Sequence, residues 1–129
     1  GDCCFKEDHP SHQYCYRHQC WKTTESVRQK LGLEENKVKS AFQSRLGKDK
    51  WIEPYTDETL ENFPKNGVKN LAIVCPAFVS DCLETLEEIS VEGKEEFLHA
   101  GGEKFHYISC LNDEDRWINV VKQLCEEEL

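Results

Sequence analysis

Four acidic side chains recur at nearly helical spacing in the middle of the chain. They are Asp81, Glu84, Glu88 and Glu92. At about 100° per residue, the four carboxylates would share one face of a helix. Carboxylates accept protons and are hard oxygen ligands for cations, so such a row could move protons or a divalent cation. Acidic residues on a helix are more often only its solvated face, and periodicity alone leaves both interpretations open.

The segment that must position this row is predicted to be a strand, a tight turn and a helix. An apolar run over residues 71–75 stops at Pro76, and Ser80 is the expected N-cap of the helix. The face opposite the carboxylates would be apolar, with Val79, Leu83, Leu86 and Ile89. In an open α/β sheet, ligands bind beyond the carboxyl ends of the strands, so the acidic row would begin at a ligand crevice.

The rest of the chain alternates helices and strands. Helices are predicted over residues 16–31, from 56 to about 63, over 97–99 and over 113–125, and strands over 38–44, 68–75 and 105–110. Gly93 is expected to break or bend the helix that follows the acidic row. This order favours an α/β fold, a parallel sheet with helices on both faces in a Rossmann-like three-layer domain.

Composition limits the class of protein and of partner. The chain has 129 residues, 38% hydrophobic and 32% charged, and its formal net charge of -9 disfavours nucleic acid and anionic membranes. No apolar run approaches the ~20 residues of a membrane span, and no signal-peptide pattern opens the chain. We therefore expect a cytoplasmic protein, with a peripheral position at the membrane as the alternative.

Half of the eight cysteines fall in the first twenty residues. These four are Cys3, Cys4, Cys15 and Cys20. Residues 1–15 lack helical or strand periodicity and are predicted to be an irregular segment, separate from an α/β domain over residues 16–129. For a cytosolic chain, thiolate ligands or free thiols are favoured over disulfides. An iron–sulfur cluster, a zinc ion and free thiols remain open at this point.

Several short sequence segments resemble those of a known protein family, which the periodicity of the chain does not reveal. They are Phe-Gln-Ser-Arg-Leu-Gly at residues 42–47, Trp51, Pro-Tyr-Thr-Asp-Glu-Thr-Leu at 54–60, and Cys-Pro-Ala-Phe-Val-Ser-Asp-Cys-Leu-Glu-Thr-Leu-Glu-Glu-Ile at 75–89. In this order they resemble the carboxy-terminal half of ferrochelatases, enzymes that insert ferrous iron into protoporphyrin IX. The resemblance extends over about residues 16–121 and implies a chelatase-like fold.

The resemblance also implies roles for single residues. It places the catalytic glutamate of the family at Glu84. It also implies a path for protons or metal on a helix with a π-type widening, with Asp81, Cys82, Glu88 and Glu92 as its residues. Cys82 stands where animal members have a histidine. Ser44, Trp51 and Phe78 match positions that line the porphyrin pocket, Ser44 near a propionate.

Two features depart from the family pattern. The histidine of the metal site, in a Ser-Ala-His sequence, belongs to the amino-terminal half and does not occur here, so we expect this chain to carry half of an active site. Some bacterial members have cysteines that bind a two-iron two-sulfur cluster, which Cys3, Cys4 and Cys15 resemble, with Cys20 or an upstream cysteine as the fourth ligand. The alternative function is a stand-alone iron–sulfur or zinc-binding module with a non-catalytic acidic helix.

Overall fold

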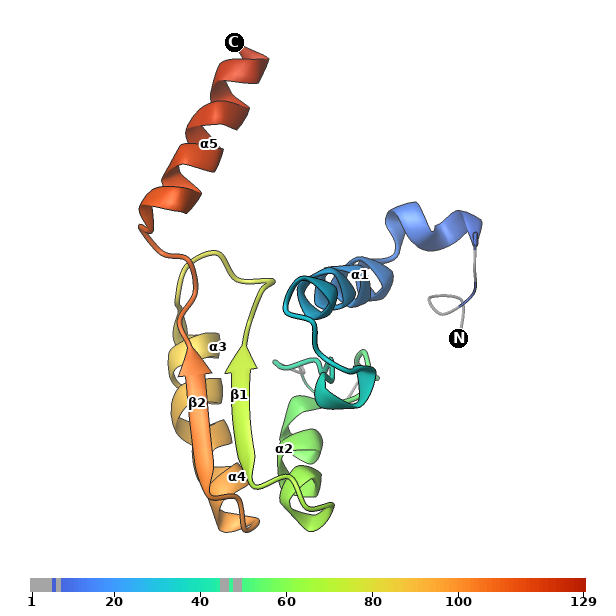
Figure 1. Ribbon diagram of the computed structural model, residues 1–129, viewed down its shortest axis with the longest axis vertical. Coiled ribbons are helices and arrows are strands. Elements are labelled where there is room, and N and C mark those ends of the chain that lie inside the picture. The colour runs from blue at the N-terminus through green and yellow to red at the C-terminus, as the bar shows by residue number, and fades with distance from the viewer. Residues whose placement is uncertain (1–5, 7, 45–46, 48–49) are drawn as a thin grey trace. The chain divides into compact units, whose positions relative to one another are not determined.

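The computed structural model in Figure 1 describes residue 6, residues 8–44, residue 47 and residues 50–129. The chain divides into two compact units, residues 1–56 and residues 57–129, and each is described by itself. The boundary predicted at residue 15 from the cysteine content stays a prediction. Cys3 and Cys4 lie outside the described residues. Within those residues, no helix is both long and apolar enough to cross a bilayer.

The first unit is built around one long helix. A short 3-10 helix, η2 (Pro10–Tyr14), leads into α1 (Tyr16–Lys30), and η3 (Glu35–Lys37) follows. The prediction of a helix from Tyr16 is confirmed. Gly32 adopts a left-handed φ of 64°, and Leu33 N–H donates to the Arg28 carbonyl at 3.1 Å, which closes the last turn of α1.

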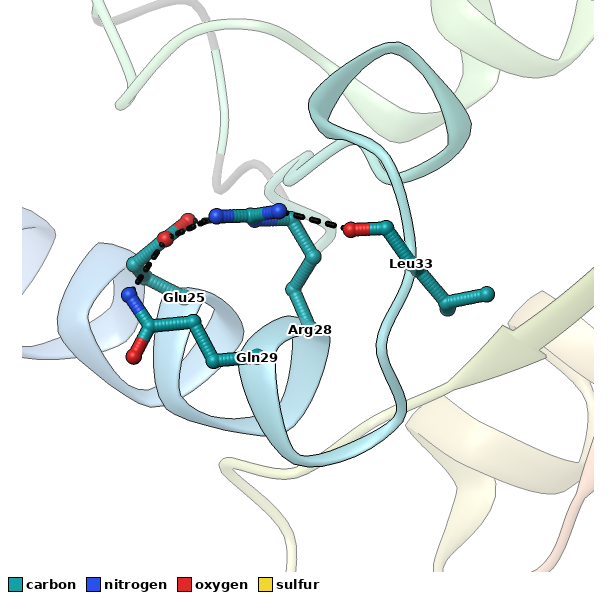
Figure 2. A network of polar contacts seen from close by, with 4 residues as sticks. All are labelled: Glu25, Arg28, Gln29 and Leu33. Carbon is teal, nitrogen blue, oxygen red and sulfur yellow. Dashed lines mark hydrogen bonds and ion pairs between the residues drawn. The ribbon is translucent and has the colours of Figure 1, made fainter.

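A polar network fixes the carboxyl end of α1 (Figure 2). The Arg28 guanidinium pairs with the Glu25 carboxylate and also donates to the Leu33 carbonyl at 2.6 Å. Gln29 Nε2 donates to the same carboxylate at 2.8 Å. Hydrogen bonds from Arg28, and then from Gln29, lower the pKa of Glu25 to about 2. The network therefore ties the segment after the helix to the helix itself.

The strand predicted over residues 38–44 is wrong. Only Phe42 pairs, in an isolated parallel bridge with Tyr55. Phe42 N–H donates to the Pro54 carbonyl at 2.9 Å, and its own carbonyl accepts from Thr56 N–H at 3.0 Å. Alternation of polar and apolar residues indicated an extended chain, but a ladder also needs a partner with free donors, and Pro54 has none.

The second unit contains a parallel sheet of two strands, which confirms the predicted α/β class. Strand β1 (Asn70–Val74) pairs with β2 (Lys104–Ile108), with Asn70 opposite Lys104 and Val74 opposite Ile108. Because both carboxyl ends lie at the same edge, the loops after Val74 and Ile108 leave the sheet together. The final helix, α5 (Asp115–Glu128), follows β2 and runs away from this edge (Figure 1).

A continuous helical segment connects the two strands. It consists of α3 (Leu83–Leu86), the π-helical turn η4 (Glu88–Gly93) and α4 (Lys94–His99). Its buried positions recur every four residues, at Thr85, Ile89, Gly93 and Phe97. The predicted apolar face is therefore wrong for Leu83, Leu86 and Val79, which are 79%, 50% and 42% exposed. The predicted break at Gly93 is also wrong, because Gly93 is helical, with φ −60°.

The glycine serves close packing instead. A Cβ at Gly93 would lie 2.9 Å from Leu60 Cδ1 of α2 (Thr56–Lys65). Leu60, Ile89 and Phe97 are the most deeply buried apolar side chains in the described chain, with at most 2% exposure. Helix α2 continues past its predicted end at Phe63, because Asn66 N–H still donates to the Asn62 carbonyl at 3.2 Å.

Candidate functional site

The loop that precedes α3 is organised around the Asp81 carboxylate. Its Oδ1 accepts from Tyr107 Oη at 2.5 Å, from Thr85 Oγ1 at 3.0 Å and from Cys110 N–H at 3.4 Å. Its Oδ2 accepts from Asn112 Nδ2 at 2.8 Å. The bonds from Asn112, then Tyr107, hold the pKa of Asp81 well below its usual range. Asp81 therefore precedes the helix as an ionised hub, not as a member of the helical row.

Asn112 joins the two loops at the carboxyl edge of the sheet. Its backbone N–H donates to the Val79 carbonyl at 2.9 Å, and its Oδ1 accepts from Asp81 N–H at 2.8 Å. Its Nδ2 donates to Asp81 Oδ2 and, at 3.2 Å, to the Cys110 carbonyl. Asn112 has a left-handed φ of 49°, which asparagine tolerates better than most residues.

The helix that carries the acidic row begins at Leu83, so Cys82 is its N-cap and the predicted cap at Ser80 is wrong. Thr85 Oγ1 accepts from Cys82 N–H at 3.0 Å while it donates to Asp81. These bonds favour a helix that starts after Asp81, because they satisfy the backbone N–H of Cys82, which precedes the first turn. Thr85 is fully buried in this double role.

Glu84 lies in the first turn of α3 and is exposed. A hydrogen bond from the Cys82 side chain is the main cause that lowers the pKa of Glu84. Glu84 is thus a carboxylate at neutral pH.

The π turn keeps the carboxylates in line. Glu92 N–H donates to the Glu87 carbonyl at 2.9 Å, five residues back, and Val91 N–H donates to the same carbonyl at 3.3 Å. Glu84, Glu88 and Glu92 recur every four residues, and the row continues to Glu96. Burial, and then the charges of Asp57, Glu61, Glu92 and Glu88, raise the pKa of Glu96. A cluster of carboxylates from two helices therefore extends from Glu84 toward α4.

Two buried thiols lie at the same edge of the sheet as the hub. Cys75 follows β1, Cys110 follows β2, and both are 8% exposed. Burial raises the pKa of the Cys75 thiol to about 12, and burial is also the largest cause that raises the pKa of Cys110. Burial, then the bond to Asp81, raises the pKa of Tyr107. All three groups are therefore neutral at physiological pH, and Tyr107 is a stable hydrogen-bond donor.

The expected pocket residues belong to different units. Trp51, 42% exposed, donates from Nε1 to the Gln43 carbonyl at 3.1 Å, and the neighbouring Ser44 has a left-handed φ of 61°. Phe78 belongs to the second unit, is half-buried, and its N–H closes a turn with the Cys75 carbonyl at 3.0 Å. Each is described within its own unit, and their assignment to one pocket stays a prediction.

The cysteine-rich segment is only partly described. Cys15 is the residue before α1, and Cys20 lies in its second turn; both are half-buried. Among the described residues, no group of three or more His, Cys, Asp or Glu side chains could hold a metal ion. The described part of the chain gives the cluster no support.

Sequence reasoning found the carboxylates but missed the residues that hold them. Thr85, Tyr107 and Asn112 were not singled out, although they supply three donors to Asp81. The available signal was local: Asn112 and Asp113 follow a strand, a place where asparagine often adopts a left-handed conformation. What the sequence did not show is that this loop would reach back to Asp81.

A parallel βαβ unit with a carboxylate row beginning at the carboxyl edge of its sheet defines an α/β domain. Comparison with known families adds the particular class. The ferrochelatase family matches residues 4–129, and the chain belongs to that family.

Individual relatives agree with this assignment. The chain is similar to the ferrochelatase of Pseudomonas putida, with 48% identity over 127 residues, and to those of Pseudomonas fluorescens and Pseudomonas entomophila, each with 48% identity over 126 residues. Each match covers 98% of this chain. The chain spans 38% of the Pseudomonas putida protein and 37% of the other two.

Proposed function

We propose that this chain supplies the carboxylate half of a site that inserts ferrous iron into protoporphyrin IX, as the carboxy-terminal domain of a ferrochelatase. Membership of the family supports the reaction class. The single observation that carries the assignment to Glu84 is its place in the first turn of α3, next to the Asp81 hub at the carboxyl edge of the sheet.

Metal insertion requires that the two pyrrole N–H groups lose their protons as the cation binds the four nitrogens. Glu84 would accept a proton, which requires a carboxylate that is ionised before the reaction. Its lowered pKa meets that condition at neutral pH. Glu88 and Glu92, each four residues further along the π-widened helix, would pass protons away from Glu84 or bring the cation to it.

Asp81 and Cys82 have a different role in this proposal from the glutamates. The oxygens of Asp81 already accept from four side-chain or backbone groups, so the carboxylate has little capacity left for a cation. Cys82 is the N-cap of the turn that carries Glu84, and its side chain favours the ionised form of that carboxyl. Both residues would then act on the position of Glu84 and not on the cargo itself.

Ser44, Trp51 and Phe78 would line the porphyrin. A flat macrocycle is suited to aromatic walls such as Trp51 and Phe78, and a serine hydroxyl such as that of Ser44 could donate to a propionate. The indole N–H of Trp51 already bonds to the Gln43 carbonyl, which leaves the faces of the ring as its contact surface for a ligand.

An anaerobic insertion assay tests the proposed division of labour. The isolated chain and the full-length protein that contains it are each given Fe²⁺ and protoporphyrin IX, and the loss of free porphyrin fluorescence is followed. We expect activity from the full-length protein and none from the isolated chain, since the Ser-Ala-His histidine and half of the cleft belong to the amino-terminal half. Insertion by the isolated chain at a rate near that of the full-length protein would contradict the proposal.

The iron–sulfur hypothesis has its own test. Anaerobically purified full-length protein should contain iron, sulfide and a visible absorption band if Cys15 is a cluster ligand, and Cys15→Ser should remove all three. Cys125→Ser is the matched control, because Cys125 is exposed on α5, outside the cysteine-rich segment. Protein without iron or sulfide would leave these thiols as free cysteines.

A further inference from the structure

We propose that Asn112, together with Tyr107, positions Glu84 through the Asp81 carboxylate. This inference rests on the proposed function of Glu84. Neither Asn112 nor Tyr107 would touch the porphyrin or the metal in this role. They would fix Asp81, the residue before the N-cap of α3, and their removal would misdirect Glu84 without removing it.

The hydrogen bonds form a series from Asn112 to Cys82, the N-cap of the helix that carries Glu84. Asn112 donates to Asp81 Oδ2 and accepts from Asp81 N–H, both at 2.8 Å. Asp81 Oδ1 accepts from Thr85 Oγ1, which in turn accepts from Cys82 N–H at 3.0 Å. Cys82 is the N-cap of α3, and Glu84 lies in the first turn that follows it. Every one of these residues lies within the second unit.

Tyr107 completes the hub from the strand side. Its hydroxyl donates to the same Oδ1 atom as Thr85, at 2.5 Å, from the penultimate residue of β2. Tyr107 belongs to strand β2 and is half-buried, so the sheet fixes the position of its backbone. The loop that carries Asp81 belongs to no strand or helix. Asp81 is therefore held between a strand on one side and the Asn112 loop on the other.

Packing does little to hold this loop in the described chain. Pro76, Ala77 and Ser80 are exposed, Val79 is 42% exposed, and Leu83 at the start of α3 is 79% exposed. Thr85 is the first fully buried residue after Cys75. The polar bridge to Asn112 thus replaces the apolar contacts that would normally fix the entry angle of a helix.

The carboxylate of Asp81 and the amide of Asn112 can be exchanged between the two positions as a test. Asn112→Asp alone places two carboxylates face to face, and Asp81→Asn alone turns an amide donor toward the Asn112 amide donor. In the double variant Asp81→Asn/Asn112→Asp, Oδ1 at position 81 still accepts from Tyr107 and Thr85, and its amide now donates to the carboxylate at 112. At the Cys110 carbonyl the Nδ2 donor is replaced by a carboxylate oxygen, so that bond is lost, two acceptors face each other, and recovery is incomplete.

The test is a double-mutant cycle in the full-length protein, with steady-state insertion kinetics. A reactive group misplaced by about 1 Å can lose ~10²-fold in rate, so each single variant should lower kcat by about 10- to 100-fold, with KM for porphyrin unchanged. The double variant should recover to within about threefold of the parent. Asp113→Asn is the matched control: it makes the same chemical change as Asp81→Asn, next to Asn112, and should leave kcat unchanged.

The outcomes separate this inference from the proposed function. A double variant that is no better than either single variant would overturn it, because an Asp81 that handles protons or metal itself cannot be replaced by a charge at 112. Glu84→Gln provides the other comparison: if it abolishes insertion while Asn112→Asp keeps the parental kcat, the positioning role alone is wrong. If a single variant fails to fold, Asn112→Gly removes the amide while accepting the left-handed backbone, and it should show the same fall in kcat.

Discussion

The π turn in the middle of the acidic helix determines which residues of that helix face the core. At about 100° per residue, an α-helix would place Thr85 and Phe97 about 120° apart, so they could not both be buried on one side. Both are fully buried. A turn that accommodates one extra residue reduces that angle to about 20°, and the hydrogen bond from Glu92 to Glu87 spans such a turn.

Deletion of Val91, which is 44% exposed, should convert the π turn into α-helix while Thr85, Ile89, Gly93 and Phe97 keep one common face. We expect the free energy of unfolding to fall by less than ~1 kcal/mol, the range of surface changes and modest backbone adjustments. Insertion of alanine after Val91 is the matched control. It rotates Phe97 by about 100° out of the core, with a cost near the ~3–5 kcal/mol of losing a buried phenylalanine.

Urea unfolding of the chain, followed by circular dichroism, measures both changes with one method. The reasoning predicts a large asymmetry between the deletion and the insertion. Equal losses of stability from the two variants would show that the spacing of four residues does not depend on the widened turn.

Two further predictions concern stability. Gly102→Ala places a Cβ about 2.2 Å from Phe97 Cε1, so thermal unfolding should show a loss of ~1–3 kcal/mol; an unchanged melting temperature would contradict this packing. Glu25 has a lowered pKa, so its stabilisation of α1 is complete above its ordinary pKa of 4.5 and is lost as pH falls through about 2. Helical ellipticity should therefore decrease from pH 4.5 to 2, and Glu25→Gln should remove much of that dependence.

The sequence predicted those elements whose signals are local. Strands β1 and β2 were found because each is a short apolar or alternating run between turn residues, and α1 because Gly32 closes it. The prediction of a helix break at Gly93 was wrong. A glycine in a helical pattern often ends the helix, but here the glycine is required because Leu60 packs closely against it. That contact joins residues from separate helices, and no local pattern contains it.

The candidate site shows the same limit. The carboxylates Glu84, Glu88 and Glu92 were found by their spacing, whereas the role of Asp81 depends on partners 26 to 31 residues away, at Tyr107 and Asn112. Asp81 was grouped with the helical row because its spacing fits, but the helix begins only at Leu83. Hydrogen bonds between separate loops decide that assignment, and they become visible only when the two strand ends are placed side by side.

The central claim is that Glu84 is the carboxylate that takes part in metal insertion. The most direct measurement compares kcat for anaerobic iron insertion in full-length Glu84→Gln, Glu88→Gln and Glu87→Gln. Glutamine keeps the size and hydrogen bonding of glutamate but removes its charge. Glu84→Gln should lower kcat by ~10²- to 10⁴-fold, the range for loss of general-base help. Glu87 is exposed and lies outside the row of Glu84, Glu88 and Glu92, so Glu87→Gln should change kcat little. Glu88→Gln should lower kcat by an intermediate factor. Small and equal effects from all three variants would contradict the claim and leave the row as a solvated face.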